Sequence, residues 1–248
     1  LECDMVAERD VAELYDIDLE SYAIGAAKDI DVAGQINLHQ NEWQRYAVQD
    51  IGLDQAYDYF QAGVLIINLD RLRQITNSKE MIQLALSRKW RCHDQDVLNV
   101  VCKNQVYYIP QQWNVLMNWK EGDRNRMQIL KMSPRILYDE SMKARKEPYI
   151  IHFAGYQKPW NVVECDFSER FWEYARYSPY YIQLLKAIAI DLIENQKPKV
   201  IVQNAPSPEK KTLIRVIVDR LLPFKTKRRE VIKQIYNMVI HPKIARKK

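Results

Sequence analysis

Residues 60–69 have the sequence FQAGVLIINL, an apolar run that is rich in branched side chains. The run is too short for a typical buried helix, and its apolar residues do not alternate with polar ones. A strand that is buried on both faces of a sheet has this pattern. Weaker strand signals lie at residues 22–27, 105–109 and 149–153. The sequence therefore predicts a sheet that is covered on both sides.

Helices are expected between these strands, each opened by a capping side chain. The expected caps are Ser78 before apolar positions 81, 84 and 86, Asp94 before positions 97, 98 and 101, Asp166 with Glu169 as a capping box, and Ser178-Pro179 before a helix at 180–195. Strands that alternate with helices form an α/β sheet. Such sheets bind their ligands at the carboxyl ends of the strands.

Charge is distributed unevenly along the chain. From Lys197 onward there are 15 basic and three acidic residues, a net charge of +12, whereas residues 1–196 carry −7. A basic block of this kind is typical of a segment that meets an anionic partner. Apolar residues recur within it at helical spacing, which predicts two short basic amphipathic helices. We therefore divide the chain into a domain at 1–196 and a tail at 197–248; no run of about 18 apolar residues predicts a membrane-spanning helix.

Glu2 and Asp4 are two carboxylates separated by one residue, close to the start of the sequence. In a strand, side chains two positions apart lie on the same face, so both carboxylates would reach one hard cation. The spacing alone is also common on protein surfaces, where such a pair binds nothing. Both interpretations stay open at this point.

Two further segments combine polar side chains with a predicted element. Asp94 and Gln95 stand at the start of a helix, where a carboxylate either caps the helix or points into a cleft to hold a polar substrate. Residues 150–160 (IIHFAGYQKPW) join an apolar strand to a histidine, a glycine and a lysine. Gly155 permits a close approach of the backbone, and Lys158 offers a positive charge to phosphate. His152, taken alone, is more often a core residue than a ligand.

Four segments together resemble the motifs of glycosyltransferase family eight. Glu2-Cys3-Asp4 is similar to its DxD segment, residues 59–69 (YFQAGVLIINL) to its YFNAGVLLINL run, residues 94–99 (DQDVLN) to its DQDILN segment, and residues 152–160 (HFAGYQKPW) to its HxxGxxKPW signature. The four occur in the order of the family. The resemblance implies the GT-A fold, which is a Rossmann-like α/β fold, and retaining transfer of galactose or glucose from a UDP-hexose.

The resemblance also implies a role for each matched residue. The implied ligands of Mn²⁺ or Mg²⁺ are Glu2, Asp4 and His152; the implied contacts to the nucleotide sugar are Gln61, Ala62, Gly63, Gly155 and Lys158; the implied catalytic pair is Asp94 and Gln95. Mixed carboxylate and imidazole ligands suit Mn²⁺. A cation and a lysine beside the departing diphosphate stabilise its growing charge. Because an amide is a poor nucleophile, we expect Gln95 to steady the oxocarbenium-like sugar rather than to attack it.

The sequence departs from the family pattern in three respects. Glu2 stands where the family has Asp, and Gln61 stands where it has Asn. The first strands and helices of the family, which bind uracil and ribose, precede its DxD segment. We therefore expect the chain to lack this N-terminal part of the fold and to bind UDP poorly. A catalytically silent relative that binds sugar or docks on a membrane is the alternative to an active transferase.

The tail extends the resemblance, since family members that act on bacterial surface saccharides have a basic, apolar tail that associates with the membrane. We expect a saccharide or glycolipid acceptor, in lipopolysaccharide or another bacterial surface glycan. We also expect a cytoplasmic protein, bound peripherally to the inner face of the plasma membrane through its tail. The alternative for the tail is a solvated basic face packed on the acidic domain. No nucleic-acid motif is present, so no nucleic-acid partner is expected.

Overall fold

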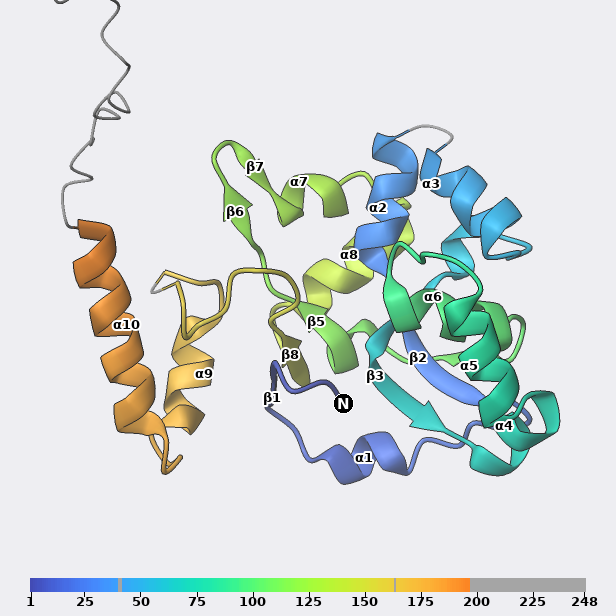
Figure 1. The fold of residues 1–248 in the computed structure, drawn as a ribbon, viewed down its shortest axis with the longest axis horizontal. Helices are drawn as coiled ribbons and strands as arrows, with labels where there is room; N and C mark the ends of the chain where they lie inside the picture. The colour runs from blue at the N-terminus through green and yellow to red at the C-terminus, as the bar shows by residue number, and fades with distance from the viewer. Residues whose placement is uncertain (40–41, 163, 197–248) are drawn as a thin grey trace, which may run out of the picture. The chain divides into compact units, whose positions relative to one another are not determined.

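A computed structural model of the protein describes residues 1–39, 42–162 and 164–196 (Figure 1). Residues Leu1–Asp191 form one compact unit. The predicted tail at 197–248, with its two amphipathic helices, lies outside the described residues and stays a prediction. Among the described residues, no helix has both the length and the apolar character needed to cross a membrane.

Two small sheets form the framework of the unit. The first has the order β3-β2-β4, in which β2 pairs antiparallel with β3 and parallel with β4. The second has the order β1-β8-β5, in which β8 pairs antiparallel with β1 and parallel with β5. A hairpin of β6 and β7 completes the described strands. Their bounds are β1 Met5–Ala7, β2 Ile24–Lys28, β3 Phe60–Ile67, β4 Val106–Tyr108, β5 Val115–Leu116, β6 Lys120–Glu121, β7 Arg124–Asn125 and β8 Ile150–His152.

Helices lie between and around these strands, as the sequence predicts for an α/β fold (Figure 1). The α-helices are α1 Val11–Tyr15, α2 Ile30–Leu38, α3 Glu42–Arg45, α4 Leu69–Ile75, α5 Ser78–Leu86, α6 His93–Val101, α7 Arg126–Leu130, α8 Arg135–Ala144, α9 Ser168–Ala175 and α10 Tyr181–Gln196. Short irregular turns of helix are η1 Tyr46–Asp50, η2 Ala56–Asp58 and η3 Gln111–Asn114. The predicted start of α10 is confirmed within one residue, and Ser178 Oγ accepts from the backbone N–H of Tyr180.

Each of the four predicted strands overlaps a strand of the structure that is shorter than expected, and β2 ends one residue beyond its predicted range. The apolar run forms β3, but the prediction that it is buried on both faces is wrong for its second half. Ile67, its last residue, is 43% exposed. The reason is that the strand leaves the core toward α4, a helix without buried residues, whereas Phe60 and Val64 earlier in the strand are 1% and 0% exposed. The strand ends there because the side chain of Asn68 caps α4.

Two predicted helix caps are wrong by one or two residues. Asn77, not Ser78, caps α5, and it forms a reciprocal capping box with Glu80. Asp94 does not cap α6, which begins one residue earlier with Cys92 at the N-cap position and no side-chain cap. Asp94 lies instead in the first turn, where its charge interacts favourably with the helix dipole.

The predicted capping box ahead of α9 is also wrong. The residue before this helix is Phe167, whose backbone is left-handed with φ 59°, and no side chain caps the helix. The carboxylate of Asp166 has other partners, because it accepts from the backbone N–H of Asn118 and from the guanidinium of Arg145, at 2.6 and 2.7 Å. Asp166 therefore joins distant segments of the chain.

A buried carboxylate holds the start of α6 against the rest of the unit. Asp96 is fully buried and accepts from the hydroxyls of Tyr46 and Tyr59 and from the backbone N–H of Cys92, at 2.6, 2.5 and 2.7 Å. Three donors satisfy a charge that burial would otherwise make costly. The neighbouring motif residues in the first turn of α6 are thereby held in one position.

Candidate active site

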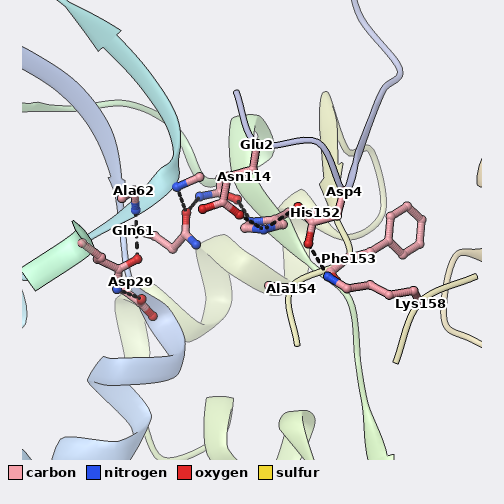
Figure 2. A network of polar contacts seen from close by, with 12 residues as sticks. Glu2, Asp4, Asp29, Gln61, Ala62, Asn114, His152, Phe153, Ala154 and Lys158 are labelled. Atoms are coloured by element: carbon pink, nitrogen blue, oxygen red, sulfur yellow. Dashed lines mark hydrogen bonds and ion pairs between the residues drawn. The ribbon is translucent and has the colours of Figure 1, made fainter. Parts of the chain in front are cut away.

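The pairing of β1 with β8 brings the N-terminal carboxylates to His152. Met5 lies opposite His152 in the antiparallel register, and the backbone N–H of Phe153 donates to the carbonyl of Asp4 at 2.9 Å. The expectation that Glu2 and Asp4 share a strand face is wrong, because β1 begins only at Met5. Even so, ligand atoms of Glu2, Asp4 and His152 lie within 4.8 Å of one another (Figure 2). The structure therefore brings the three predicted metal ligands together.

The three side chains suit a divalent cation by both chemistry and geometry. His152 Nε2 lies 3.0 Å from Glu2 Oε2 and 3.4 Å from Asp4 Oδ1. Asp4 Oδ1 is buried and makes no hydrogen bond, which is rare for a buried polar atom. Two carboxylates and an imidazole are ligands that Mn²⁺ accepts. A bound cation would supply the missing partner of this oxygen, so the residues fit the cation that the sequence predicts.

Charge in this cluster is balanced within the protein. Lys158 Nζ forms an ion pair with Asp4 and donates to the carbonyl of Phe153 at 2.6 Å. The contact with His152, aided by Lys158 and opposed by burial, lowers the pKa of Asp4 well below its usual range. Burial alone would lower the pKa of His152, but its contacts with Asp4 and Glu2 outweigh burial and raise that pKa. The two carboxylates therefore stabilise the protonated imidazole relative to its neutral form, against the effect of burial.

The backbone of β3 forms one wall of the cluster. Gly63 lies so close to His152 that an added Cβ would meet Cε1 of the ring at 2.6 Å. Its carbonyl also accepts from the backbone N–H of Glu2 at 3.0 Å. A glycine is therefore required at this position, because any side chain would occupy the place of the imidazole.

Gln95 is tied to β3 and to the end of β2. Its Oε1 accepts from the backbone N–H of Ala62 and its Nε2 donates to Asp29, both at 2.9 Å. Asp29 is fully buried and caps α2 through the backbone N–H of Val32. Burial, reinforced by the nearby charge of Asp31, raises the pKa of Asp29 to about 6. Gln95 thus has a fixed orientation beside the Gln61–Gly63 segment.

Asp94 points elsewhere than Gln95, as expected for adjacent residues on a helix. Its side chain is exposed and lines a cavity of about 580 Å³ between α5 and α6, together with Trp90, His93 and apolar residues of α5. Among the described residues, no hydrogen bond or ion pair joins Asp94 to the carboxylate–histidine cluster. The structure therefore places the two residues of the predicted catalytic pair in different surroundings.

Gly155 lies in the loop that follows β8. Its φ of +109° belongs to the left-handed half of backbone space, which explains the glycine. It lines a cavity of about 410 Å³ with Trp119, Tyr156 and residues of the β6–β7 hairpin. Arg126 holds this loop, because it donates to the carbonyl of Ala154 at 3.1 Å and to Asp31 at 2.8 Å. Of the two predicted phosphate-binding residues, Lys158 therefore contacts the cluster, whereas the neighbours of Gly155 are Trp119 and Arg126.

Sequence reasoning missed several residues that shape the site. Asp29 had a detectable signal, because it is the polar residue that directly follows strand β2, at an edge where ligands bind. Arg126 and Asn114 had none. Asn114 lies in the short turn η3, is 3% exposed and contacts both His152 and Gln61. Only the folded structure shows that these side chains meet.

Comparisons with known proteins support the fold and the motifs. The chain is similar to the WbbM bifunctional glycosyltransferase in its apo structure, with a TM-score of 0.67 and 27% identity over 74% of this chain and 33% of that chain. It is 24% identical to General stress protein A of Bacillus subtilis (strain 168) over 72% of this chain and 58% of that protein. It is 22% identical to Lipopolysaccharide 1,2-glucosyltransferase of Escherichia coli (strain K12), over 65% of this chain and 43% of that protein.

The chain thus spans about half the length of the curated relatives it matches. The predicted GT-A type of α/β fold is confirmed by the structural similarity. The sequence model described as Glycosyl transferase family 8 matches residues 1–164, which include all four motifs. The chain belongs to glycosyltransferase family 8.

Proposed function

We propose that the protein is a retaining hexosyltransferase, which moves galactose or glucose from a UDP-hexose to a saccharide acceptor with the help of Mn²⁺ or Mg²⁺. The observation that carries the proposal is the convergence of Glu2, Asp4 and His152, with Lys158 beside them. These residues come from opposite ends of the domain sequence. Their meeting creates a site for a cation and a diphosphate, which is the combination that transfer from a nucleotide sugar requires.

The cluster supplies what the leaving group needs. Cleavage of the bond between sugar and diphosphate builds negative charge on the diphosphate. A bound divalent cation, held by Asp4 and His152 with Glu2, supplies charge neutralisation there. The ammonium of Lys158 lies on the same side and adds a donor that acts most strongly on the more charged transition state.

The sugar is expected beside β3 and the start of α6. Gln95 is fixed by the backbone of Ala62 and by Asp29, so its amide presents an unchanging dipole to a bound hexose. Because both ends of this amide already bond to the protein, and an amide is a weak nucleophile, Gln95 steadies positive charge on the sugar rather than attacking it. Asp94 is free of such bonds in the described structure, and its carboxylate is available to the sugar.

We further propose that the acceptor belongs to a bacterial surface glycan and that the tail holds the protein on an anionic membrane. The similarity to a lipopolysaccharide glucosyltransferase supports the first statement. The net charge of +12 after residue 196 supports the second, since each basic residue near an anionic surface contributes about 1 kcal/mol. Both fit a cytoplasmic protein bound peripherally to the inner face of the plasma membrane.

Hydrolysis of UDP-galactose and UDP-glucose, measured with Mn²⁺ and with EDTA on the chain completed by the family's nucleotide-binding N-terminal part, tests the proposed activity. We expect slow hydrolysis that EDTA abolishes. The variant Asp94→Asn should lose most of this hydrolysis while its unfolding free energy falls by no more than about 1 kcal/mol, the contribution of a charge in the first turn of a helix, because the side chain is exposed and makes no hydrogen bond with the described residues. Asp70→Asn, at an exposed position of α4, is the control. Mn²⁺ binding without any hydrolysis would instead identify a catalytically silent relative.

A further inference from the structure

A chain of three hydrogen bonds leads from the backbone of β3 to the inner nitrogen of His152 (Figure 2). The N–H of Gly63 donates to Gln61 Oε1 at 2.5 Å. Nδ2 of Asn114 donates to the same oxygen at 2.6 Å. The other end of that amide, Asn114 Oδ1, lies 3.0 Å from His152 Nδ1. The opposite ring nitrogen, Nε2, faces the carboxylates of Glu2 and Asp4.

The direction of every bond in this chain follows from its first member. A backbone N–H can only donate, so Gln61 must turn its oxygen toward Gly63. Asn114 then reaches that oxygen with its NH₂ group, because two carbonyl oxygens would repel each other. The oxygen of Asn114 is left facing the imidazole, and an oxygen requires a proton on Nδ1. The hydrogen therefore resides on Nδ1, and Nε2 is the nitrogen that remains for a ligand.

We propose that Gln61 and Asn114 are positioning residues. Starting from the Gly63 N–H, each fixes the orientation of the next side chain, so that the hydrogen of His152 stays on Nδ1 and Nε2 stays directed at the cation. The part of this inference that concerns the cation rests on the proposed function. The placement of the proton on Nδ1 does not. A histidine that binds a metal commonly donates its other N–H to an oxygen, which fixes the ring and raises its basicity.

Burial makes the chain rigid. Asn114 and His152 are 3% and 1% exposed, so water does not compete for their bonds. Both ring nitrogens have polar partners, so rotation of the ring would break these contacts. Gln61 is the residue where the sequence departs from the family's Asn. Its longer side chain returns to the N–H two residues on, which commits its oxygen to the protein and leaves only its NH₂ group for a bound sugar.

The test is the Nδ1–H signal of His152 in the metal-free chain of 248 residues, labelled with ¹⁵N-histidine, which contains four histidines. We expect a slowly exchanging Nδ1–H in the wild type. Gln61→Met keeps the size of the side chain but removes the acceptor, so Asn114 can turn over and the Nδ1–H should exchange at least 10-fold faster. Gln61→Glu keeps an acceptor for both donors and should restore slow exchange.

Gln111→Met is the control, because Gln111 lies in the same turn as Asn114 and is also buried, but its side chain bonds to the carbonyl of Lys28 and not to the hydrogen-bonded chain. It should leave the Nδ1–H signal unchanged. The inference is overturned if Gln61→Met exchanges like the wild type, or if the wild type lacks a protected Nδ1–H. The latter result would mean that the amide of Asn114 points the other way.

Titration of Mn²⁺ into the same variants separates this inference from the proposed function. We expect about a 10-fold weaker affinity in Gln61→Met and an unchanged one in Gln111→Met, in line with other partners of metal-binding histidines. Changed Nδ1–H exchange with unchanged Mn²⁺ affinity would overturn the link to the cation. If Gln61→Met exchanges its Nδ1–H faster but the wild type binds no Mn²⁺, the proposed function is overturned and the hydrogen-bonded chain stands.

Discussion

Gly63→Ala should damage the carboxylate–histidine cluster more than it damages the fold. The added Cβ would lie 2.6 Å from Cε1 of His152, so the ring must move by about 0.8 Å to reach an ordinary contact of 3.4 Å. The ring cannot do this freely, because both of its nitrogens are bonded and it is 1% exposed. The clash with Met5 at 2.7 Å is easier to relieve, since that side chain is flexible.

The expected cost in stability is about 1–3 kcal/mol, typical of overpacking in a buried site. For a chain of this length that corresponds to a fall in Tm of roughly 2–12 °C. The loss of function should be larger, because a misplacement of about 1 Å at a reacting centre costs on the order of 10²-fold in rate. We also expect Mn²⁺ affinity to fall at least 10-fold, measured by titration calorimetry.

Gly52→Ala is the matched control for this experiment. Gly52 has φ +85°, and no atom lies within 4 Å of an added Cβ. Its substitution should cost about 1–2 kcal/mol through backbone strain alone, without touching His152. The two variants therefore lose similar stability for different reasons. Wild-type Mn²⁺ affinity in folded Gly63→Ala would show that the ring tolerates displacement and would refute the steric argument.

Three further outcomes follow from the buried charges. Because burial raises the pKa of Asp29 to about 6 from 3.8, the folded state holds that proton more tightly, and its stabilising effect is lost as pH rises through about 4 to 6. Between pH 4 and pH 7 the unfolding free energy of the wild type, measured with urea, should fall by about 3 kcal/mol relative to that of Asp29→Asn, whose side chain does not titrate. Tyr46→Phe and Tyr59→Phe should each lower the unfolding free energy by about 1.5–3 kcal/mol. The double variant should lose more than the sum of the two, because of the three described donors to Asp96 it keeps one, the backbone N–H of Cys92. Simple additivity in a double-mutant cycle would contradict this. Lys158→Met should slow UDP-hexose hydrolysis on the order of 10²-fold, and an unchanged rate would remove the ammonium from the mechanism.

The sequence predicts those features that depend on short-range pattern. The apolar run of β3 and the strand before His152 are both recognisable, because a buried strand leaves a continuous apolar signature. The cap of α5 is not, since Asn77 and Ser78 are neighbouring residues with similar capping ability. The choice between them depends on where the backbone enters the helix. Exposure at the end of β3 also depends on the elements around it rather than on its own residues.

In the candidate site, too, some features are predicted by the sequence and others depend on tertiary packing. The resemblance to glycosyltransferase family eight implies that Glu2, Asp4, His152 and Lys158 act together, and the structure brings them into contact. Their individual roles in metal and phosphate binding stay predictions. Asn114 could not be predicted, because nothing in an isolated Gln-Gln-Trp-Asn segment indicates which buried partner its amide will meet. Asn114 meets His152 and Gln61 because η3, β8 and β3 pack together, and the local sequence around Asn114 does not indicate this packing.

The carboxylate–histidine cluster explains why the site is stable before any substrate arrives. Two carboxylates, of Glu2 and Asp4, face an imidazole whose pKa is raised and an ammonium from Lys158. The ammonium of Lys158 compensates the carboxylate of Asp4 in a partly buried place, where unpaired charge would be costly. Under the proposed function, a divalent cation at the cluster would compete with this ammonium for the oxygens of Asp4. Cation binding would thereby release Lys158 from Asp4 and leave its charge available to the diphosphate of the proposed donor.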